Sequence, residues 1–489
     1  MDNNTIISNL SAPEKLALLK KQLLEKANKD NQVYPLSYGQ KALYFLYLNS
    51  PESASYNVAF TVKIVSKLNE DALRKAFQKL IDNNESLRTT YYIRDGEPVQ
   101  EVHGYKEIFF EITDAQDLAD EDLKNKVEAV YKVPFNLEKG PVFKVHLFRT
   151  NEDNFVMLIK MHHICSDGWS IGIMLNQLKQ FYEDEISGIK TFVSESKNYS
   201  EYIKNQKALI DSEGGMKLWS YWKNELNNEI PILDLPVDLT RPAIQKYNGS
   251  TEYFFLDKDA VDKLKKLSQA EGTTLFVSLL TAFQILIHKY SGQDEILTGT
   301  PTAGRNKAEF EKIVGYFINP VVIRGHYNDD KSFKDVLREI KQKVLGAIAH
   351  QDFPFQLIVE RLLKKRDPSR SPIFQTFFGL QKVPKGKEIQ ELVVPGNTGA
   401  RVNWRSLELE SFDIAQQEGQ FDLIMEFFEG DNLFTGVIKY NSDLFYHERI
   451  KRMCGHFKEL LNSILDNPEY KISELQILSG DENKFLLSD

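Results

Sequence analysis

A strand, a short turn and a helix in direct succession constrain the fold of this chain more than any other feature. Residues 155–161 (FVMLIKM) predict a β-strand in which every odd-numbered side chain is apolar. Apolar residues from Ile171 to Tyr182 recur at helical spacing, which predicts a helix that begins near Ser170, with Ser170 as its cap. Further alternation of helical and strand patterns along the chain indicates the α/β (α+β) class.

Two adjacent histidines, His162 and His163, open that turn, and Asp167 and Gly168 close it. Successive side chains of a strand point to opposite faces, so the two imidazoles diverge. His163 continues the apolar face, whereas His162 shares a face with Lys160, which favours His163 as the reacting group. A purely structural histidine is the alternative for this segment. We place His163, Gly168 and His162 in a catalytic group in which His162 supports the turn through a hydrogen bond.

Length, charge and cysteine number exclude several classes of protein. At 489 residues the chain is too long for one compact core, which predicts two lobes. The formal net charge of −9 argues against a nucleic-acid partner. Two cysteines, Cys165 and Cys454, cannot build a disulfide framework, which fits a reducing cytoplasm. Cys165 lies within the histidine turn, and we interpret it as a small buried residue and not as a nucleophile.

Motifs that hold cofactors or metals are absent from the sequence. It contains no phosphate loop, no dinucleotide fingerprint and no His-Glu-x-x-His motif, and diverging neighbours such as His162 and His163 do not share a metal. No apolar run approaches the roughly 20 residues that span a bilayer, and the first residues do not resemble a secretory signal. We expect no bound cofactor, no metal, no membrane contact and a cytoplasmic location.

The chain divides into four predicted segments. These are a leader helix in 1–32, an N-terminal lobe in 33–190, a C-terminal lobe in 191–471 and an extended linker to a following domain in 472–489, with the polar stretch 186–212 as the lobe boundary. The predicted helices are 68–81, 274–290, 333–350 and 447–465. The predicted strands are 89–93, 142–149, 155–161, 252–256, 295–298, 421–428 and 433–440, and 382–399 is a predicted loop.

The stretch 162–168 (HHICSDG) resembles the signature of the condensation domains of nonribosomal peptide synthetases. Six further stretches resemble that family in the expected order: 36–40 (LSYGQ) with 43–46, 85–89 (ESLRT), 199–202 (YSEY), 314–319 (VGYFIN), 350–355 (HQDFPF) and 366–375 (RDPSRSPIFQ). One departure is that Asn83 and Asn84 stand where the second motif begins Arg-His, although Arg88 remains. The order Gly168-Trp169-Ser170 resembles the condensing branch and not the epimerising one.

The resemblance implies two chloramphenicol-acetyltransferase-like lobes that form a pseudo-dimer with a tunnel between them. Upstream donor and downstream acceptor carrier proteins would dock at opposite mouths, each with a substrate thioester on its phosphopantetheine arm, beside an adjacent adenylation domain. The acceptor amine would attack the donor carbonyl to form an amide. The family also implies that Asp167 is structural, through an ion pair with Arg305 in 299–305 (GTPTAGR).

The residue chemistry suits this reaction. His163 would position the attacking amine and accept its proton, or act as an electrostatic partner, and Gly168 would let the substrate approach near backbone N–H groups at the helix start. Trp169, Ser170 and Asn319 are candidate substrate contacts, although Trp169 also suits helix packing and Asn319 also suits a turn. The rival functions are an acyltransferase with a soluble acceptor, an epimerisation domain and a non-catalytic module that docks carriers.

Overall fold

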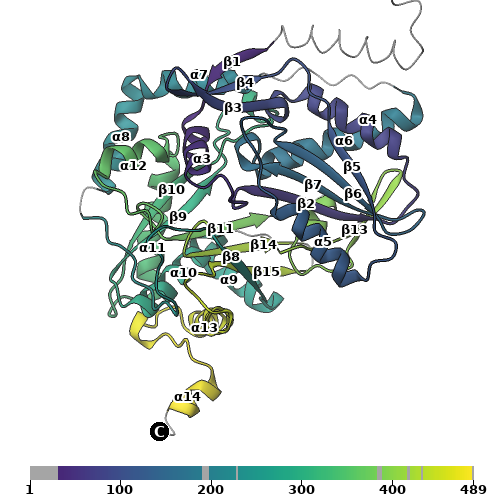
Figure 1. Cartoon of the computed structure of the whole chain (residues 1–489). Helices are drawn as coiled ribbons and strands as arrows, with labels where there is room; N and C mark the ends of the chain where they lie inside the picture. The colour runs from purple at the N-terminus through teal and green to yellow at the C-terminus, as the bar shows by residue number, and fades with distance from the viewer. Residues whose placement is uncertain are drawn as a thin grey trace, which may run out of the picture.

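Two α/β lobes, each built on a six-stranded sheet, make up the described part of the chain (Figure 1). The structure is a computed structural model and describes residues 31–189, 198–226, 229–382, 388–415, 419–430 and 433–486. A three-stranded sheet lies beside the first lobe. The predicted α/β class is confirmed. The predicted leader helix falls outside the described residues, except that Gln32 already begins strand β1.

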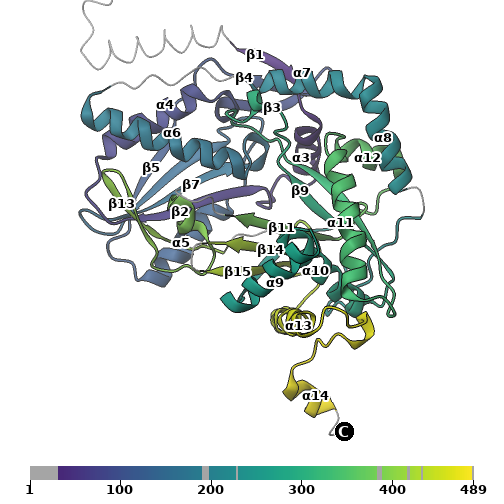
Figure 2. The same cartoon turned by 180° about the vertical axis from the view of Figure 1, so that it is seen from behind.

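The first lobe covers its sheet with helices on both faces. In chain order it contains β1 (Gln32–Pro35), α3 (Tyr38–Asn49), β2 (Asn57–Ile64), α4 (Glu70–Asn83), β3 (Thr89–Arg94), β4 (Glu97–Val102), β5 (Phe109–Asp114), α5 (Asp120–Lys132), β6 (Phe143–Arg149), β7 (Phe155–His162) and α6 (Gly168–Ser187). With two late strands, β12 (Arg401–Trp404) and β13 (Leu407–Ser411), the sheet order is β12-β13-β2-β7-β6-β5, and only β5 and β6 pair in parallel. Helices α4 and α6 pack on one face and α5 packs on the other, so both faces are apolar (Figures 1 and 2).

Strand β7 occupies the middle of this sheet, and all eight of its side chains are buried. It pairs with β2 on one side, where Asn57 lies opposite His162, and with β6 on the other. Burial on both faces explains why the strand is an almost continuous apolar run. The prediction of a strand followed by a helix is confirmed, but the cap was assigned to the wrong residue. Helix α6 begins at Gly168 with Asp167 as its cap, because the Asp167 carboxylate accepts the Ser170 N–H at 2.8 Å.

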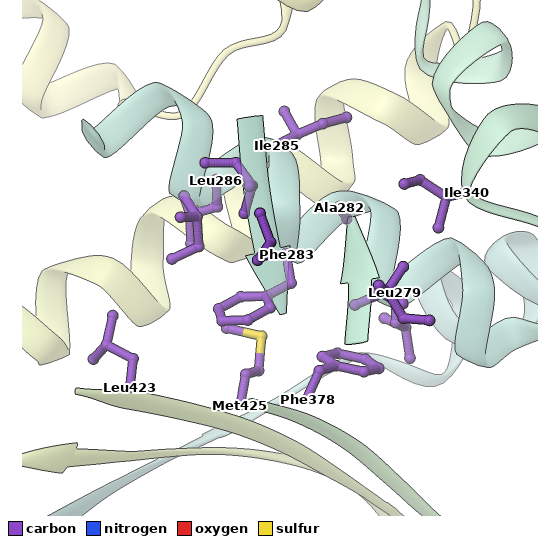
Figure 3. Close-up of a cluster of buried hydrophobic side chains, with 14 of the residues drawn as sticks. Leu279, Ala282, Phe283, Ile285, Leu286, Ile340, Phe378, Leu423 and Met425 are labelled. Atoms are coloured by element: carbon purple, nitrogen blue, oxygen red, sulfur yellow. The ribbon is translucent and has the colours of Figure 1, made fainter. Parts of the chain in front are cut away.

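The second lobe is built around one helix that is buried on all sides. In chain order it contains α7 (Tyr199–Ile210), α8 (Glu213–Glu225), β8 (Gly249–Phe255), α9 (Lys258–Ala270), α10 (Leu275–Ser291), β9 (Glu295–Thr302), β10 (Asn319–His326), α11 (Phe333–Ala349), α12 (Phe355–Leu362), β11 (Thr376–Lys382), β14 (Leu423–Glu429), β15 (Phe434–Asn441), α13 (His447–Asp466) and α14 (Gly480–Leu486). Leu279, Phe283 and Leu286 of α10 meet Phe378 and Met425 of the sheet (Figure 3). The sheet order is β10-β9-β11-β14-β15-β8, in which β11 is parallel to both neighbours.

The late part of the chain returns to the first lobe. Strands β12 (Arg401–Trp404) and β13 (Leu407–Ser411) join the first sheet, where Leu409 pairs with Ile64 of β2 and is fully buried. The segment 191–471 is therefore not confined to one lobe, contrary to the predicted boundaries. The physical reason is that Trp404, Leu407 and Leu409 bury apolar surface in the first core, which no surface loop could do.

The predicted extended linker is also wrong for 472–479. Ile472 and Leu475 are buried in the core of the second lobe, and Lys471 forms a β-bridge with Ser332. Two apolar side chains at this spacing anchor the segment beside α13. Within the described ranges no single helix is both long and apolar enough to cross a membrane. Helices α9 and α10 would be long and apolar enough only if they were taken together, and they are sharply bent relative to each other.

Candidate active site

The site lies where β7 ends and the chain turns into α6. His163 begins a single 3-10 turn (His163–Cys165), and its backbone N–H donates to the carbonyl of Tyr56 at 2.8 Å, next to the start of β2. The imidazole Nδ1 lies 2.7 Å from the backbone carbonyl oxygen of Ser166. A carbonyl oxygen only accepts hydrogen bonds, so Nδ1 carries the proton and Nε2 of the neutral ring carries the lone pair. The half-buried imidazole thus offers a base at Nε2.

His162 has the opposite surroundings. Its ring is buried, packs edge-on against Phe135 with centroids 6.2 Å apart, and lies 6.4 Å from Tyr56. Its Nδ1 accepts the N–H of Ile164 at 3.1 Å, so it supports the turn as the sequence predicted. Burial, with a smaller effect of His163, lowers the pKa of His162 to about 3. The side chain is neutral and faces the core, which assigns it to the structure of the turn and not to the reaction.

Strand parity placed His162 on the face of Lys160, and Phe135 touches both side chains. Lys160 is buried and donates to the carbonyls of Val130, at 3.0 Å, and Val133 at the end of α5. Burial, with a smaller effect of Lys144, lowers the pKa of Lys160 to about 7. A lysine here anchors α5 beneath the strand that carries the histidines.

Asp167 and Arg305 form a buried ion pair between the two lobes. Arg305 Nη1 donates to Asp167 Oδ2 at 2.6 Å, and both side chains are only 1% exposed. The guanidinium also lies 4.0 Å from the centroid of the Phe317 ring. Asp167 Oδ1 accepts the Ser170 N–H that caps α6. One carboxylate therefore holds the start of the helix and a residue of the second lobe.

Ser170 extends this cluster. Its hydroxyl accepts from Arg305 Nη2 at 2.8 Å and lies 2.9 Å from the carbonyl of Gly315, whose N–H donates to it at 3.1 Å. Phe317 N–H donates to Asp167 Oδ2 at 3.1 Å. Ser170 is fully buried and its hydroxyl is hydrogen-bonded to these partners. We therefore assign Ser170 to joining the lobes and not, as the sequence predicted, to contacting substrate.

The two other candidate substrate contacts, Trp169 and Asn319, have different surroundings. Trp169 is 51% exposed, and its indole N–H donates to the carbonyl of Glu311 at 2.9 Å, so it reaches the second lobe while about half of the residue stays exposed. Asn319 uses its whole amide on backbone: Nδ2 donates to Gln351 and Phe353, and Oδ1 accepts from Phe355. The structure therefore assigns Asn319 to fixing the turn before α12 and not to substrate.

Two further positions bear on the chemistry. Gly168 is exposed, and a Cβ added there would meet no atom within 4 Å. Burial raises the pKa of the Cys165 thiol to about 12, so it remains protonated and is not a nucleophile. In the described part of the chain no group of three or more His, Cys, Asp or Glu side chains could hold a metal ion.

Tyr316, on the loop before β10, lies at the site but was not predicted as a site residue. Its ring centroid is 5.2 Å from that of His163, with the planes at 79°. The available signal was its place within 314–319, one of the stretches that resemble the family. Nothing in the sequence alone indicates which side chain of that stretch meets the imidazole.

Comparisons with known proteins show which family the chain belongs to. The Condensation domain family model matches residues 30–487. Gramicidin S synthase 2 of Brevibacillus brevis is 34% identical over 463 residues, which is 94% of this chain and 10% of that protein. Bacitracin synthase 2 of Bacillus licheniformis is 32% identical over 489 residues, 99% of this chain and 18% of that protein. The chain thus spans less than a fifth of the length of these relatives.

Solved structures show the same architecture. A holo four-domain nonribosomal peptide synthetase bound to AMP and glycine aligns with a TM-score of 0.86 at 25% identity, over 93% of this chain and 35% of that one. The X-domain from teicoplanin biosynthesis aligns with a TM-score of 0.82 at 21% identity, over 91% of this chain and 97% of that one. The predicted pair of chloramphenicol-acetyltransferase-like lobes is confirmed.

The chain belongs to the condensation-domain family, whose members are amide-bond-forming, acyltransferase-type enzymes of nonribosomal peptide synthetases.

Replacing Asp167 with alanine should destabilise the fold strongly. The variant leaves the Arg305 guanidinium buried without its counter-ion, which costs roughly 3–5 kcal/mol of unfolding free energy. Urea denaturation measures the loss. The exposed Asp211, paired with Lys207, is the matched control, and its alanine variant should unfold with the wild type. An Asp167→Ala protein with wild-type stability and no activity would instead assign Asp167 to the reaction.

Acidification should weaken the fold through His162. The pKa of a histidine in the unfolded chain is about 6.5, whereas burial lowers the pKa of folded His162 to about 3. Between these two pH values only the unfolded chain binds the proton. The contribution of neutral His162 to stability is therefore complete above pH ~6.5. On acidification toward pH 3 the free energy of unfolding falls by up to ~1.4 kcal/mol per pH unit. His162→Asn keeps an acceptor for Ile164 but does not titrate. Its stability deficit relative to wild type should shrink from pH 7 to pH 5; a constant deficit contradicts the assignment.

Proposed function

We propose that this chain forms an amide bond between an acyl or peptidyl thioester donor and an aminoacyl thioester acceptor, each carried on the phosphopantetheine arm of a carrier protein. The observation that carries the proposal is the half-buried imidazole of His163, which has its lone pair on Nε2 and lies against Tyr316 of the opposite lobe. The family resemblance supplies the tunnel through which the two arms would reach it.

The reaction requires only a modest catalytic contribution from His163. A free α-amine titrates near 7.7 to 8.0, so much of it is already nucleophilic at neutral pH, and a thioester is an activated acyl donor. The amine nitrogen attacks the thioester carbonyl and forms the C–N bond while Nε2 accepts a proton from that nitrogen. The tetrahedral intermediate then breaks its C–S bond and releases the donor arm as a thiolate, which takes the proton from Nε2 and becomes a thiol. Such base catalysis contributes typically about 10²- to 10⁴-fold.

The start of helix α6 supplies the second part of the site. The backbone N–H groups of Gly168 and Trp169 lie at the positive end of the helix dipole, where they suit the developing oxyanion. Arg305 neutralises the Asp167 carboxylate, so the capping residue does not present an uncompensated negative charge there. Because no protein atom would obstruct a Cβ at Gly168, the protein itself does not require glycine at this position. We attribute the glycine to a substrate that passes close to the backbone.

The proposed partners follow from the relatives. The chain covers 10% of gramicidin S synthase 2 and 18% of bacitracin synthase 2, which are much larger proteins. We propose that this domain likewise works with an upstream donor carrier, a downstream acceptor carrier and an adjacent adenylation domain. Phosphopantetheine belongs to the carriers, and we propose no cofactor for the domain itself.

Replacing His163 with alanine should abolish amide formation while leaving the fold intact. The side chain is half-buried and its loss removes the base, so product formation should fall by about 10²-fold or more with an unchanged melting temperature. Intact-mass analysis of two loaded carrier proteins measures the mass gained by the acceptor carrier. His326→Ala, on β10, is the matched control for loss of a histidine. Undiminished product from His163→Ala would contradict the proposal, and carrier binding without product from wild type would favour a docking module.

Enlarging Gly168 should slow the reaction without weakening the fold. The Cβ of Gly168→Ala or Gly168→Leu would meet no protein atom within 4 Å and the position is exposed, so both variants should melt with the wild type. The larger side chain would displace the substrate, which costs on the order of 10²-fold in rate. Measuring kcat and melting temperature for both variants separates the two effects. A leucine variant with wild-type kcat would show that no substrate passes close to this position.

A further inference from the structure

A tyrosine of the second lobe packs against the imidazole of the first. The Tyr316 ring lies edge-on to His163, with centroids 5.2 Å apart and planes at 79°. The same ring approaches Gly39 of α3, where an added Cβ would lie 2.8 Å from Tyr316 Cε1. The ring therefore contacts both α3 and the imidazole. Glycine at position 39 provides the space that this arrangement needs.

The backbone around Tyr316 is anchored on both sides of the ring. The Tyr199 hydroxyl donates to the Tyr316 carbonyl and lies 3.0 Å from Ser37 Oγ. The preceding residue is bound by the Ser170 hydroxyl, and the following Phe317 N–H donates to Asp167 at 3.1 Å. Three consecutive residues of the second lobe are thus bound to partners that include the cap of α6. These contacts fix the backbone that carries the Tyr316 ring, so the ring can leave His163 only by rotation about its own side-chain torsions.

His163 needs such a constraint. A single hydrogen bond, from Nδ1 to the Ser166 carbonyl, sets its ring orientation from within its own turn. The second side-chain torsion of histidine has broad minima, so one bond leaves the ring free to rock. An edge-on aromatic contact adds a preferred orientation. Burial raises the pKa of Tyr316, so its phenol is neutral and adds packing without adding charge.

We propose that Tyr316 is a positioning residue, whose ring holds the His163 imidazole so that Nε2 faces the attacking amine. This inference rests on the proposed function of His163. The contact originates in the opposite lobe, so it completes the base only when the loop before β10 is bound to the cap of α6. The contact between the two lobes then also sets the orientation of the His163 imidazole.

The kinetic test compares two variants of Tyr316. Tyr316→Phe keeps the ring and should retain kcat within about threefold. Tyr316→Leu removes it and should lower kcat about tenfold with an unchanged KM for the acceptor carrier. Tyr202→Leu is the matched control, because Tyr202 packs against Phe310 and Phe317 in the adjoining cluster. It should lower the melting temperature and leave the kcat of the folded protein unchanged. Equal losses of kcat in both leucine variants, or none in Tyr316→Leu, would overturn the proposal.

Imidazole NMR tests the same proposal without turnover. In wild type labelled at histidine, the His163 resonances, assigned by their loss in His163→Gln, should show one tautomer with the proton on Nδ1. Tyr316→Leu should broaden or shift these resonances, and Tyr316→Phe should not. Unchanged resonances in Tyr316→Leu would overturn the positioning role. A wild-type protein that shows the ordered tautomer and forms no amide would overturn the proposed function alone.

Discussion

The buried ion pair between Asp167 and Arg305 is the contact on which the site depends. Removing two charges from water is costly, and such a pair stabilises a protein only when its remaining hydrogen-bonding groups are also satisfied. Here the carboxylate also accepts from Ser170 and Phe317, and the guanidinium also donates to the Ser170 hydroxyl and the Ile313 carbonyl. Among the described residues, only Nε of the guanidinium has no hydrogen-bond partner, and the group lies over the Phe317 ring. The same carboxylate caps α6, so the start of the helix, the histidine turn and the second lobe are fixed together.

Two adjacent histidines acquire different roles from this arrangement. His162 is the last residue of β7 and is buried, so it is neutral and holds the turn. His163 has already left the strand and is half-buried, and with Nδ1 bound to the Ser166 carbonyl its lone pair is on Nε2. Strand geometry separates the two rings, and the cap of α6 fixes the length of the turn that follows. One imidazole is thereby committed to structure and the other is available for proton transfer.

The periodicity of apolar residues predicted those helices and strands in which one continuous segment supplies the whole buried face. The strand at 155–161, the helix at 274–290 and the divergence of the two histidines followed from periodicity and agree with β7, α10 and the turn. Pairing across the chain could not be predicted: nothing near Leu409 indicates that its partner is Ile64. The cap was assigned to Ser170 because serine and aspartate both suit a helix cap, and only the observed start of α6 at Gly168, where Asp167 accepts the Ser170 N–H, distinguishes them. Tyr316 could not be predicted as a site residue because its contact with His163 joins two lobes.

A double-mutant cycle on the ion pair tests most directly whether Asp167 and Arg305 act as one unit. The free energy of unfolding would be measured for Asp167→Leu, Arg305→Leu and the double variant by urea denaturation. Each single variant leaves a buried charge without its partner, whereas the double variant leaves neither. If the two residues act as one unit, the double variant should lose less unfolding free energy than the sum of the two single losses, by roughly 1–3 kcal/mol. Losses that add to within about 0.5 kcal/mol would show that the two residues act independently and would contradict this prediction.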